Sequence, residues 1–293
     1  MATLRDIKSR IKGVKSTQQI TKAMKMVAAA RLRRAQENVV NARPYARMIW
    51  QSLSHLASEN DLDTNPFFVQ REVKNVACVI VTADRGLCGA FNSNIIKEAV
   101  RYINEDLNSS AVNVNLFCVG KKGFDFFSRR NFKLYDKNIG LFSSLAYSEA
   151  LNIYQKIISA YLDGTFDKVV IIYNEFKSII HQKIVIEQFL PITLVTENTD
   201  SVQKNQPNYI YEPDQKSIFK YLLPKHLKAQ IWRILLESNA SELGARMTAM
   251  DNASTNAKEL IRTLQLKYNK ERQAAITKEL LEIVAGANAL KAS

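Results

Sequence analysis

The chain has 293 residues, 46% of them hydrophobic, which is enough to bury a core in one large domain or two small ones. Its formal net charge of +13 predicts an acidic partner, which leaves nucleic acid, anionic lipid and an acidic protein surface as candidates. The longest apolar run, around Val76 to Val81, is far shorter than the roughly 20 residues of a membrane-spanning helix, which argues against direct membrane insertion.

Residues 1–58 are predicted to form one long helix of a coiled coil. From Leu4 to Leu56, the positions that alternate three and four residues apart are apolar except for Gln18, Thr21 and Lys25. Many of these seam residues are alanine, so a partner helix can approach closely. Pro44 is expected to kink the helix without ending it.

The same segment carries much of the positive charge of the chain. Residues 1–50 hold twelve Lys or Arg residues against Asp6 and Glu37, a local charge of +10. No aromatic residue that could stack on a base precedes Tyr45, so a protein contact is favoured over nucleic acid. The N-terminus is charged at once and has no apolar region typical of a secretory signal, which predicts a cytoplasmic location.

Residues 73–213 are predicted to form a small α/β domain. The apolar runs NVACVIVTA, VNVNLFCVG and FDKVVIIYN alternate with segments of helical composition, SNIIKEAVRYINEDL and SEALNIYQKIISAYLDG. This alternation is typical of a mainly parallel sheet. KIVIEQFLP follows without an intervening helix and is expected to add an antiparallel edge strand.

Residues 215–293 are expected to form a second coiled-coil helix that pairs antiparallel with the first. A seam runs from Leu236 to Leu264 with Ser254 as its one polar member. This helix should extend about a dozen residues, roughly 18 Å, beyond its partner. An apolar stripe on the extension would then fit a surrounding sleeve; it comprises Ile276, Leu280, Ile283, Ala287 and Leu290.

The turn TADRGLCGAFN lies where a phosphate-binding loop would follow a buried strand. It has Gly86 and Gly89 but lacks the Gly-Lys-Ser/Thr of a P-loop and the three-glycine dinucleotide pattern. A structural turn is therefore favoured, with Asn92 or Ser93 capping the next helix. Asp84 and Arg85 are expected to form a local ion pair rather than an acid–base pair.

No catalytic, cofactor or metal site can be recognised. The histidines lie in different segments with no carboxylate or cysteine at ligand spacing; they are His55, His181 and His226. The cysteines lie in or beside apolar runs and are expected to be reduced and buried; they are Cys78, Cys88 and Cys118. We therefore expect no catalytic residue, no cofactor and no metal in this chain.

Over essentially its full length the sequence resembles the family of gamma subunits of bacterial F-type ATP synthases. The matching stretches are RIKGVKSTQQITKAMKMVAAARLRRAQ, TADRGLCGAFN, YEPD and a stretch of about fifty residues from ASELGARMTAMDNAS to the C-terminus. The alternative from the residues alone is a free-standing coiled-coil protein that binds a nucleotide or nucleic acid.

The resemblance implies a noncatalytic rotor shaft that couples proton flow through the c-ring to ATP synthesis or hydrolysis at the beta subunits. The implied partners are the alpha and beta subunits, the epsilon subunit and the c-ring, at the cytoplasmic face of the inner membrane. The fold implied is an antiparallel coiled coil with an inserted, Rossmann-like α/β domain. The stretch from Pro191 to Pro224 has no cysteine, so the redox control of one family variant is absent.

The resemblance also assigns partner contacts residue by residue. Met24 and Lys25 would meet an acidic lever of the beta subunit. Arg272 and Gln273 would meet its catch loop, with further contacts at Thr277, Glu279, Glu282 and, lower on the same helix, Arg246. The epsilon and c-ring contacts would fall around Tyr209 and Glu212.

Overall fold

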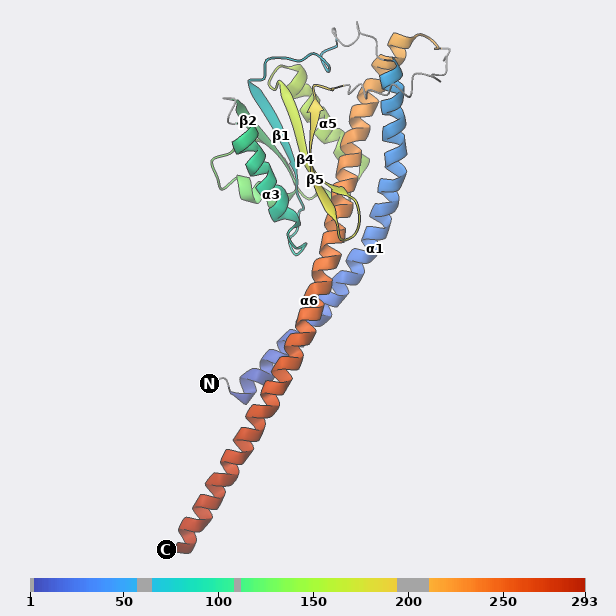
Figure 1. The fold of residues 1–293 in the computed structure, drawn as a ribbon. Coiled ribbons are helices and arrows are strands. Elements are labelled where there is room, and N and C mark those ends of the chain that lie inside the picture. The colour runs from blue at the N-terminus through green and yellow to red at the C-terminus, as the bar shows by residue number, and fades with distance from the viewer. Residues whose placement is uncertain (1–2, 57–64, 108–111, 194–210, 293) are drawn as a thin grey trace. The chain divides into compact units, whose positions relative to one another are not determined.

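The computed structural model describes residues 3–56, 65–107, 112–193 and 211–292 (Figure 1). The chain divides into two compact units, each described here by itself. The helical unit comprises Met1–Ala28 and Met247–Ser293, and the sheet unit comprises Ala29–Arg246. Two long helices contribute to both units, α1 (Leu4–Leu56) and α6 (Gln215–Ala292).

The predicted coiled-coil seams are confirmed. Every predicted seam position of α1 is buried or half-buried, including the three polar ones, and so is every position predicted from Leu236 to Leu264 in α6. The pairing is antiparallel within each unit, because Thr21 meets Ser254 and Lys25 meets Asp251 in the helical unit, while Arg43 meets Glu237 and Leu56 meets Gln215 in the sheet unit. Pro44 and Pro224 both lie inside continuous helices.

The sheet unit contains a five-stranded sheet in the order β3-β2-β1-β4-β5. Strands β1 (Asn75–Val81), β2 (Asn113–Val119), β3 (Lys133–Asn138) and β4 (Lys168–Phe176) are parallel neighbours. The last strand, β5 (Gln182–Leu190), pairs antiparallel with β4, which confirms the predicted edge strand.

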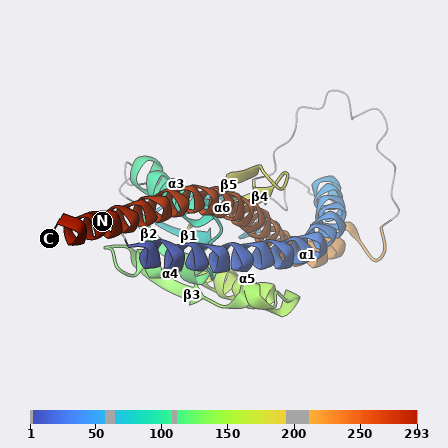
Figure 2. The ribbon, with the colours of Figure 1, turned by 90° about the horizontal axis from the view of Figure 1, so that it is seen from below.

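Helices cover both faces of this sheet (Figure 2). On one face, α3 (Phe91–Arg101), its π-helical continuation Tyr102–Leu107 and α4 (Lys121–Phe127) bury a core around Ile80, Ile95 and Phe127. The other face is covered by α5 (Tyr147–Leu162) and by one side of α6. A short 3-10 helix, Leu141–Ser143, precedes α5.

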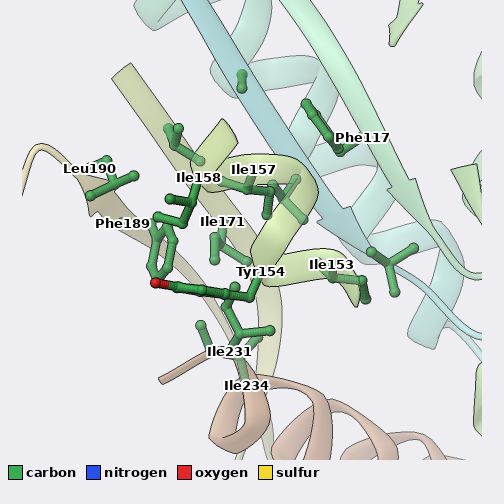
Figure 3. Close-up of a cluster of buried hydrophobic side chains, with 14 of the residues drawn as sticks. Phe117, Ile153, Tyr154, Ile157, Ile158, Ile171, Phe189, Leu190, Ile231 and Ile234 are labelled. Carbon is green, nitrogen blue, oxygen red and sulfur yellow. The ribbon is translucent and has the colours of Figure 1, made fainter. Parts of the chain in front are cut away.

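The core on the second face joins the sheet to α6. Figure 3 shows Ile231 and Ile234 of α6 facing Tyr154 of α5, with Phe189 of β5 beside them. Ile157 of α5 and Ile234 of α6 are almost completely buried. Full burial of one such side chain stabilises the folded state by about 1.5–3 kcal/mol, so α6 is an integral part of this core.

The three cysteines confirm the prediction of buried, reduced thiols. Each is free and buried. Burial raises the pKa of Cys78 and of Cys118 to about 12, and that of Cys88 to about 11. At neutral pH these thiols are therefore protonated and poor nucleophiles.

His226 of α6 makes the folded state sensitive to acid. Its ring packs on Trp50 of α1 with centroids 5.0 Å apart, and its Nδ1 has no hydrogen-bond partner among the described residues. Burial, helped by the charge of Arg233, lowers the pKa of His226 to about 4, below the usual 6.5. The unfolded chain therefore takes up a proton between pH 6.5 and 4 that the folded chain rejects.

As the pH falls from 7 to 4, we expect this difference in the pKa of His226 to lower the free energy of unfolding by about 3 kcal/mol. Above pH 6.5 it has no effect. Urea unfolding of the wild type and of His226→Leu at pH 7, 5.5 and 4 checks this. Below pH 6.5, the free energy of unfolding should fall more steeply for the wild type than for the variant. Parallel pH profiles of the two proteins would refute this expectation.

Candidate functional site

The turn TADRGLCGAFN, between β1 and α3, uses its polar groups inside the protein. The carboxylate of Asp84 accepts backbone N–H bonds from Lys121 (3.0 Å), Gly140 (2.7 Å) and Phe142 (3.1 Å). The hydroxyl of Thr82 accepts a bond from the N–H of Gly123 at 2.8 Å. The turn therefore joins the loops that follow β2 and β3.

Two local predictions for this turn were wrong. The described residues contain no ion pair between Asp84 and Arg85, because the Asp84 carboxylate is already bound by backbone N–H groups. The N-cap position of α3 is Ala90 rather than Asn92 or Ser93, and no described side chain makes a capping hydrogen bond there. Asn92 lies within α3, and its side-chain oxygen accepts the N–H of Ala83 at 2.9 Å.

The loop after β2 packs directly on this turn. Gly120 has φ +93°, and a Cβ built there would lie 2.0 Å from the carbonyl oxygen of Thr82. Only glycine fits so close to another backbone with this conformation. Gly120 thus permits the loop after β2 to pack closely against the turn, which agrees with a structural role for this turn.

Arg246 of α6 also binds this turn. Its guanidinium donates to the carbonyl oxygen of Gly86 at 2.8 Å and pairs with Glu242, one helical turn earlier. Both side chains of the pair are only 14% exposed. Burial raises the pKa of Glu242 above its usual range, although Arg246 opposes this. The structure therefore gives Arg246 an internal role that the sequence did not predict.

In the helical unit, the polar gap of the α1 seam meets polar residues of α6. The hydroxyls of Thr21 and Ser254 lie 2.8 Å apart, and the Gln18 amide donates to the Ser254 carbonyl oxygen at 3.5 Å. Lys25 Nζ pairs with Asp251 Oδ1 at 2.6 Å. The side chain of Lys25 is still 39% exposed, so this ion pair leaves it accessible to a partner. Met24, beside it, is half-buried.

The last part of α6 exposes a mixed surface. The side chains predicted as contacts are all exposed there: Arg272, Gln273, Thr277, Glu279 and Glu282. The apolar stripe is also exposed, with Ile276 at 49%, Leu280 at 58% and Ile283 at 67%. Ala287 and Leu290, the other predicted members of the stripe, lie outside the described side chains.

The extension of α6 beyond α1 is longer than predicted. The beginning of α1, at Arg5 and Lys8, lies beside Tyr268 and Asn269 of α6 in one groove. From Asn269, α6 continues for 23 residues, or about 35 Å, to Ala292. The prediction assumed that the two helices begin at the same level and differ only in length. Instead, residues near 25 pair with residues near 251, which sets a different register.

The groove at the start of α1 was not recognised in the sequence. It has a volume of about 790 Å³, and four basic side chains line it, Arg5, Lys8, Lys12 and Lys15. Their spacing of three and four residues places them on one face of α1, and this spacing could have indicated a basic surface from the sequence. In the described part of the chain, none of the four forms a salt bridge.

The predicted c-ring and epsilon contact can be placed only in part. Glu212 is exposed just before α6, whereas Tyr209 lies outside the described residues. Where the chain is described, no cluster of three potential metal ligands is present, and none of its helices is both long and apolar enough to cross a membrane.

Known proteins match this chain over nearly its whole length. The family model described as ATP synthase matches residues 3–290. The ATP synthase gamma chain of Chlorobium phaeobacteroides is 52% identical over 294 residues, covering 99% of this chain and 100% of the relative. That of Chlorobaculum tepidum is likewise 52% identical, with the same coverage.

Solved structures agree in fold. The match in the central stalk and c-ring structure of the Tetrahymena thermophila mitochondrial ATP synthase is 26% identical, with a TM-score of 0.61, covering 80% of this chain and 99% of that one. A chain of the Euglena gracilis mitochondrial enzyme is 22% identical, with a TM-score of 0.69, covering 99% and 95%. With the full-length relatives, these findings identify the chain as a member of the ATP synthase gamma chain family.

Proposed function

We propose that this chain is the central-stalk rotor of a proton-translocating F-type ATP synthase and is not itself catalytic. The observation that carries the proposal is the full-length match to gamma chains together with two long helices, of which α6 shares a core with an inserted sheet. Rotation of such a chain would couple proton flow through a c-ring to conformational change at the catalytic subunits.

The proposed partners are the alpha and beta subunits of the head, the c-ring and the epsilon subunit. The structural relatives are described as parts of a central stalk with its c-ring and of an assembly of F1 with a c-ring, which supports the head and the ring as partners. The epsilon subunit is proposed as a partner because of the family resemblance alone. These partners would hold the chain peripherally at the cytoplasmic face of the inner membrane.

The exposed parts of the helical unit are the proposed contacts with the head. Met24 and Lys25 would meet an acidic lever of beta, and Arg272 and Gln273 its catch loop, with Thr277, Glu279 and Glu282 nearby. Exposure of the α6 side chains supports this assignment. The basic groove at Arg5 to Lys15 supports an acidic housing around the same helices.

Arg246 and the region of Glu212 have different roles in this proposal. Arg246 is 14% exposed and bound to Glu242 and Gly86, which favours a role in holding the turn after β1 against α6 rather than direct partner contact. Glu212 is exposed, and with Tyr209 it is proposed to contact epsilon and the c-ring.

The packing of the helices suits a rotating shaft. Alanines at the seam, such as Ala28 and Ala35, let the two helix backbones approach closely, which favours torsional stiffness. The basic residues on the outer face would attract an acidic housing through interactions that water and salt screen. Such attraction can guide the shaft without locking it at one angle.

We expect the isolated chain to bind neither ATP nor NAD. The polar groups of the turn at Gly86 and Gly89 bind neighbouring loops, and the turn lacks a P-loop lysine. Isothermal titration calorimetry with millimolar nucleotide should give only heats of dilution. A one-to-one binding isotherm would overturn the assignment of this turn as structural.

Native mass spectrometry of the complex purified through a tag on this chain tests the proposed function. The expected complex contains the head subunits alpha and beta, epsilon and, when it is extracted with detergent, a c-ring. Purification of the chain alone, or bound to nucleic acid, would contradict the rotor assignment and favour a free-standing coiled-coil protein.

A further inference from the structure

Four alternating charges form a chain across three elements of the sheet unit. Arg43 of α1 donates through Nε to Glu237 Oε1 of α6 at 3.2 Å. Arg233, one turn earlier on α6, lies 3.4 Å from the same oxygen and donates to both carboxylate oxygens of Glu187 of β5, at 3.1 Å each. We call these four residues the charge chain.

Both ends of the charge chain are fixed to the sheet. Arg43 also donates to the carbonyl oxygen of Phe176, the last residue of β4, at 2.8 Å. At the other end, Glu187 accepts bonds from the Tyr173 hydroxyl and the Gln230 amide, both at 2.7 Å. Burial alone would raise the pKa of Glu187, but Arg233 and these two donors hold it below its usual range.

The middle of the charge chain is buried, whereas the Arg43 side chain at its end is 43% exposed. The side chain of Glu237 is only 2% exposed, and its second oxygen has no partner among the described residues. Its charge therefore depends on Arg43 and Arg233. Losing one partner of a buried ion pair leaves an uncompensated charge, which is far more costly than losing an exposed pair.

Among the other contacts between α1 and α6 in this unit, Trp50 packs on His226, and the Gln215 side chain donates to the carbonyl oxygen of Leu56 at 3.1 Å. The seam residues Leu32, Ala35 and Val39 are apolar, and so are Ile231 and Ile234, which pack on the sheet core. The apolar seam already gives the helix pair torsional stiffness, to which contacts between fixed charges can add. Hydrogen bonds between fixed charges restrict both distance and angle.

We propose that the charge chain is a torque-bearing link that ties α1 to the sheet and to α6. Arg43 is its critical positioning residue, because it is the member that ties α1 to both α6 and β4. The inference rests on the proposed rotor function, since only a rotor must transmit torque from the sheet into both helices. Since α6 is also held to the sheet by its apolar core and by hydrogen bonds from Ser241 and Arg246, loss of this link would chiefly let α1 lag behind the sheet.

Single-molecule torsion measurements can test this link in the assembled complex. The catalytic head is fixed to a surface, and a bead is attached through a cysteine introduced at the exposed Arg129, since the three native cysteines are buried. At each catalytic dwell, the width of the bead's angular distribution reports torsional stiffness. Glu237→Gln, which keeps the shape of the side chain, and Arg43→Gln, which is shorter and removes the charge, should both broaden this distribution.

Because Arg43 and Glu237 act together, the angular distribution of the double variant should be no broader than that of the more strongly affected single variant. Arg43→Lys, which keeps the charge but not the forked geometry, should fall between the wild type and Arg43→Gln. Arg33→Gln with Glu37→Gln is the matched control, since that α1 ion pair is 85% and 62% exposed and should leave the width unchanged.

The outcomes separate this inference from the rotor assignment. If the wild-type head hydrolyses ATP while the bead does not rotate, the proposed function is wrong. If the wild type rotates and the charge-chain variants have its angular width, the torque-bearing link is wrong. If Arg43→Gln does not assemble, Glu237→Gln decides, and a wild-type width in that variant overturns the proposal.

Discussion

Replacement of Lys25 by glutamate is expected to weaken the coupling between ATP hydrolysis and proton pumping while the complex still assembles. Lys25 occupies the polar gap of the α1 seam, so the substitution removes no apolar core residue. The ion pair with Asp251 is about half-exposed, and such pairs contribute only about 0–1 kcal/mol to stability. A like charge facing an acidic lever of beta would instead repel the surface that Lys25 is proposed to attract.

The Asp251 partner allows the intramolecular and intermolecular roles of Lys25 to be separated. Lys25→Glu combined with Asp251→Lys restores an ion pair at this position but leaves residue 25 acidic. If Lys25 contacts beta, the double variant should remain poorly coupled. Recovery of the wild-type ratio of protons pumped to ATP hydrolysed would show that Lys25 acts only within the helix pair.

Removal of residues 283–293 is expected to lower the stability of the assembled complex while part of the torque persists. Ile283 and Val284 are exposed in the isolated chain at 67% and 55% and would be buried by the surrounding head. Each fully buried aliphatic side chain contributes about 1.5–3 kcal/mol, so the truncated shaft should be held less firmly. The seam from Leu264 to Leu236 remains intact and would still transmit rotation.

Arg272→Ala combined with Gln273→Ala is the contrasting variant. These side chains bury little apolar area, but their charge-assisted hydrogen bonds to a catch loop would form and break at defined angles. Turnover should therefore fall more than stability. ATP hydrolysis and thermal melting of both purified complexes are the measurements. A truncated complex without activity and a normal double variant would reverse the roles assigned to the tip and the catch.

The elements that the sequence predicted best are those whose buried residues recur at one regular spacing along the chain. The heptad spacing of α1 predicts its buried positions, including the polar Thr21, because every third or fourth residue must face α6. The apolar strands β1, β2 and β4 are equally clear, since both of their faces are covered.

The elements that were missed have weak patterns. Strand β3, with the sequence KLYDKN, is a polar edge strand whose residues are exposed or half-buried, and α4 has only seven residues. The internal roles of Asp84, Arg246 and Glu237 depend on contacts between residues far apart in the chain. No local spacing indicates such contacts, so only the three-dimensional structure could reveal them.

Direct observation of rotation tests the central claim. With the catalytic head fixed and a bead on the cysteine introduced at Arg129, addition of ATP should drive stepwise rotation of the bead in one direction. An inhibitor of the catalytic sites should stop it. Sustained ATP hydrolysis by the same complexes with a stationary bead would contradict the account of this chain as the rotor.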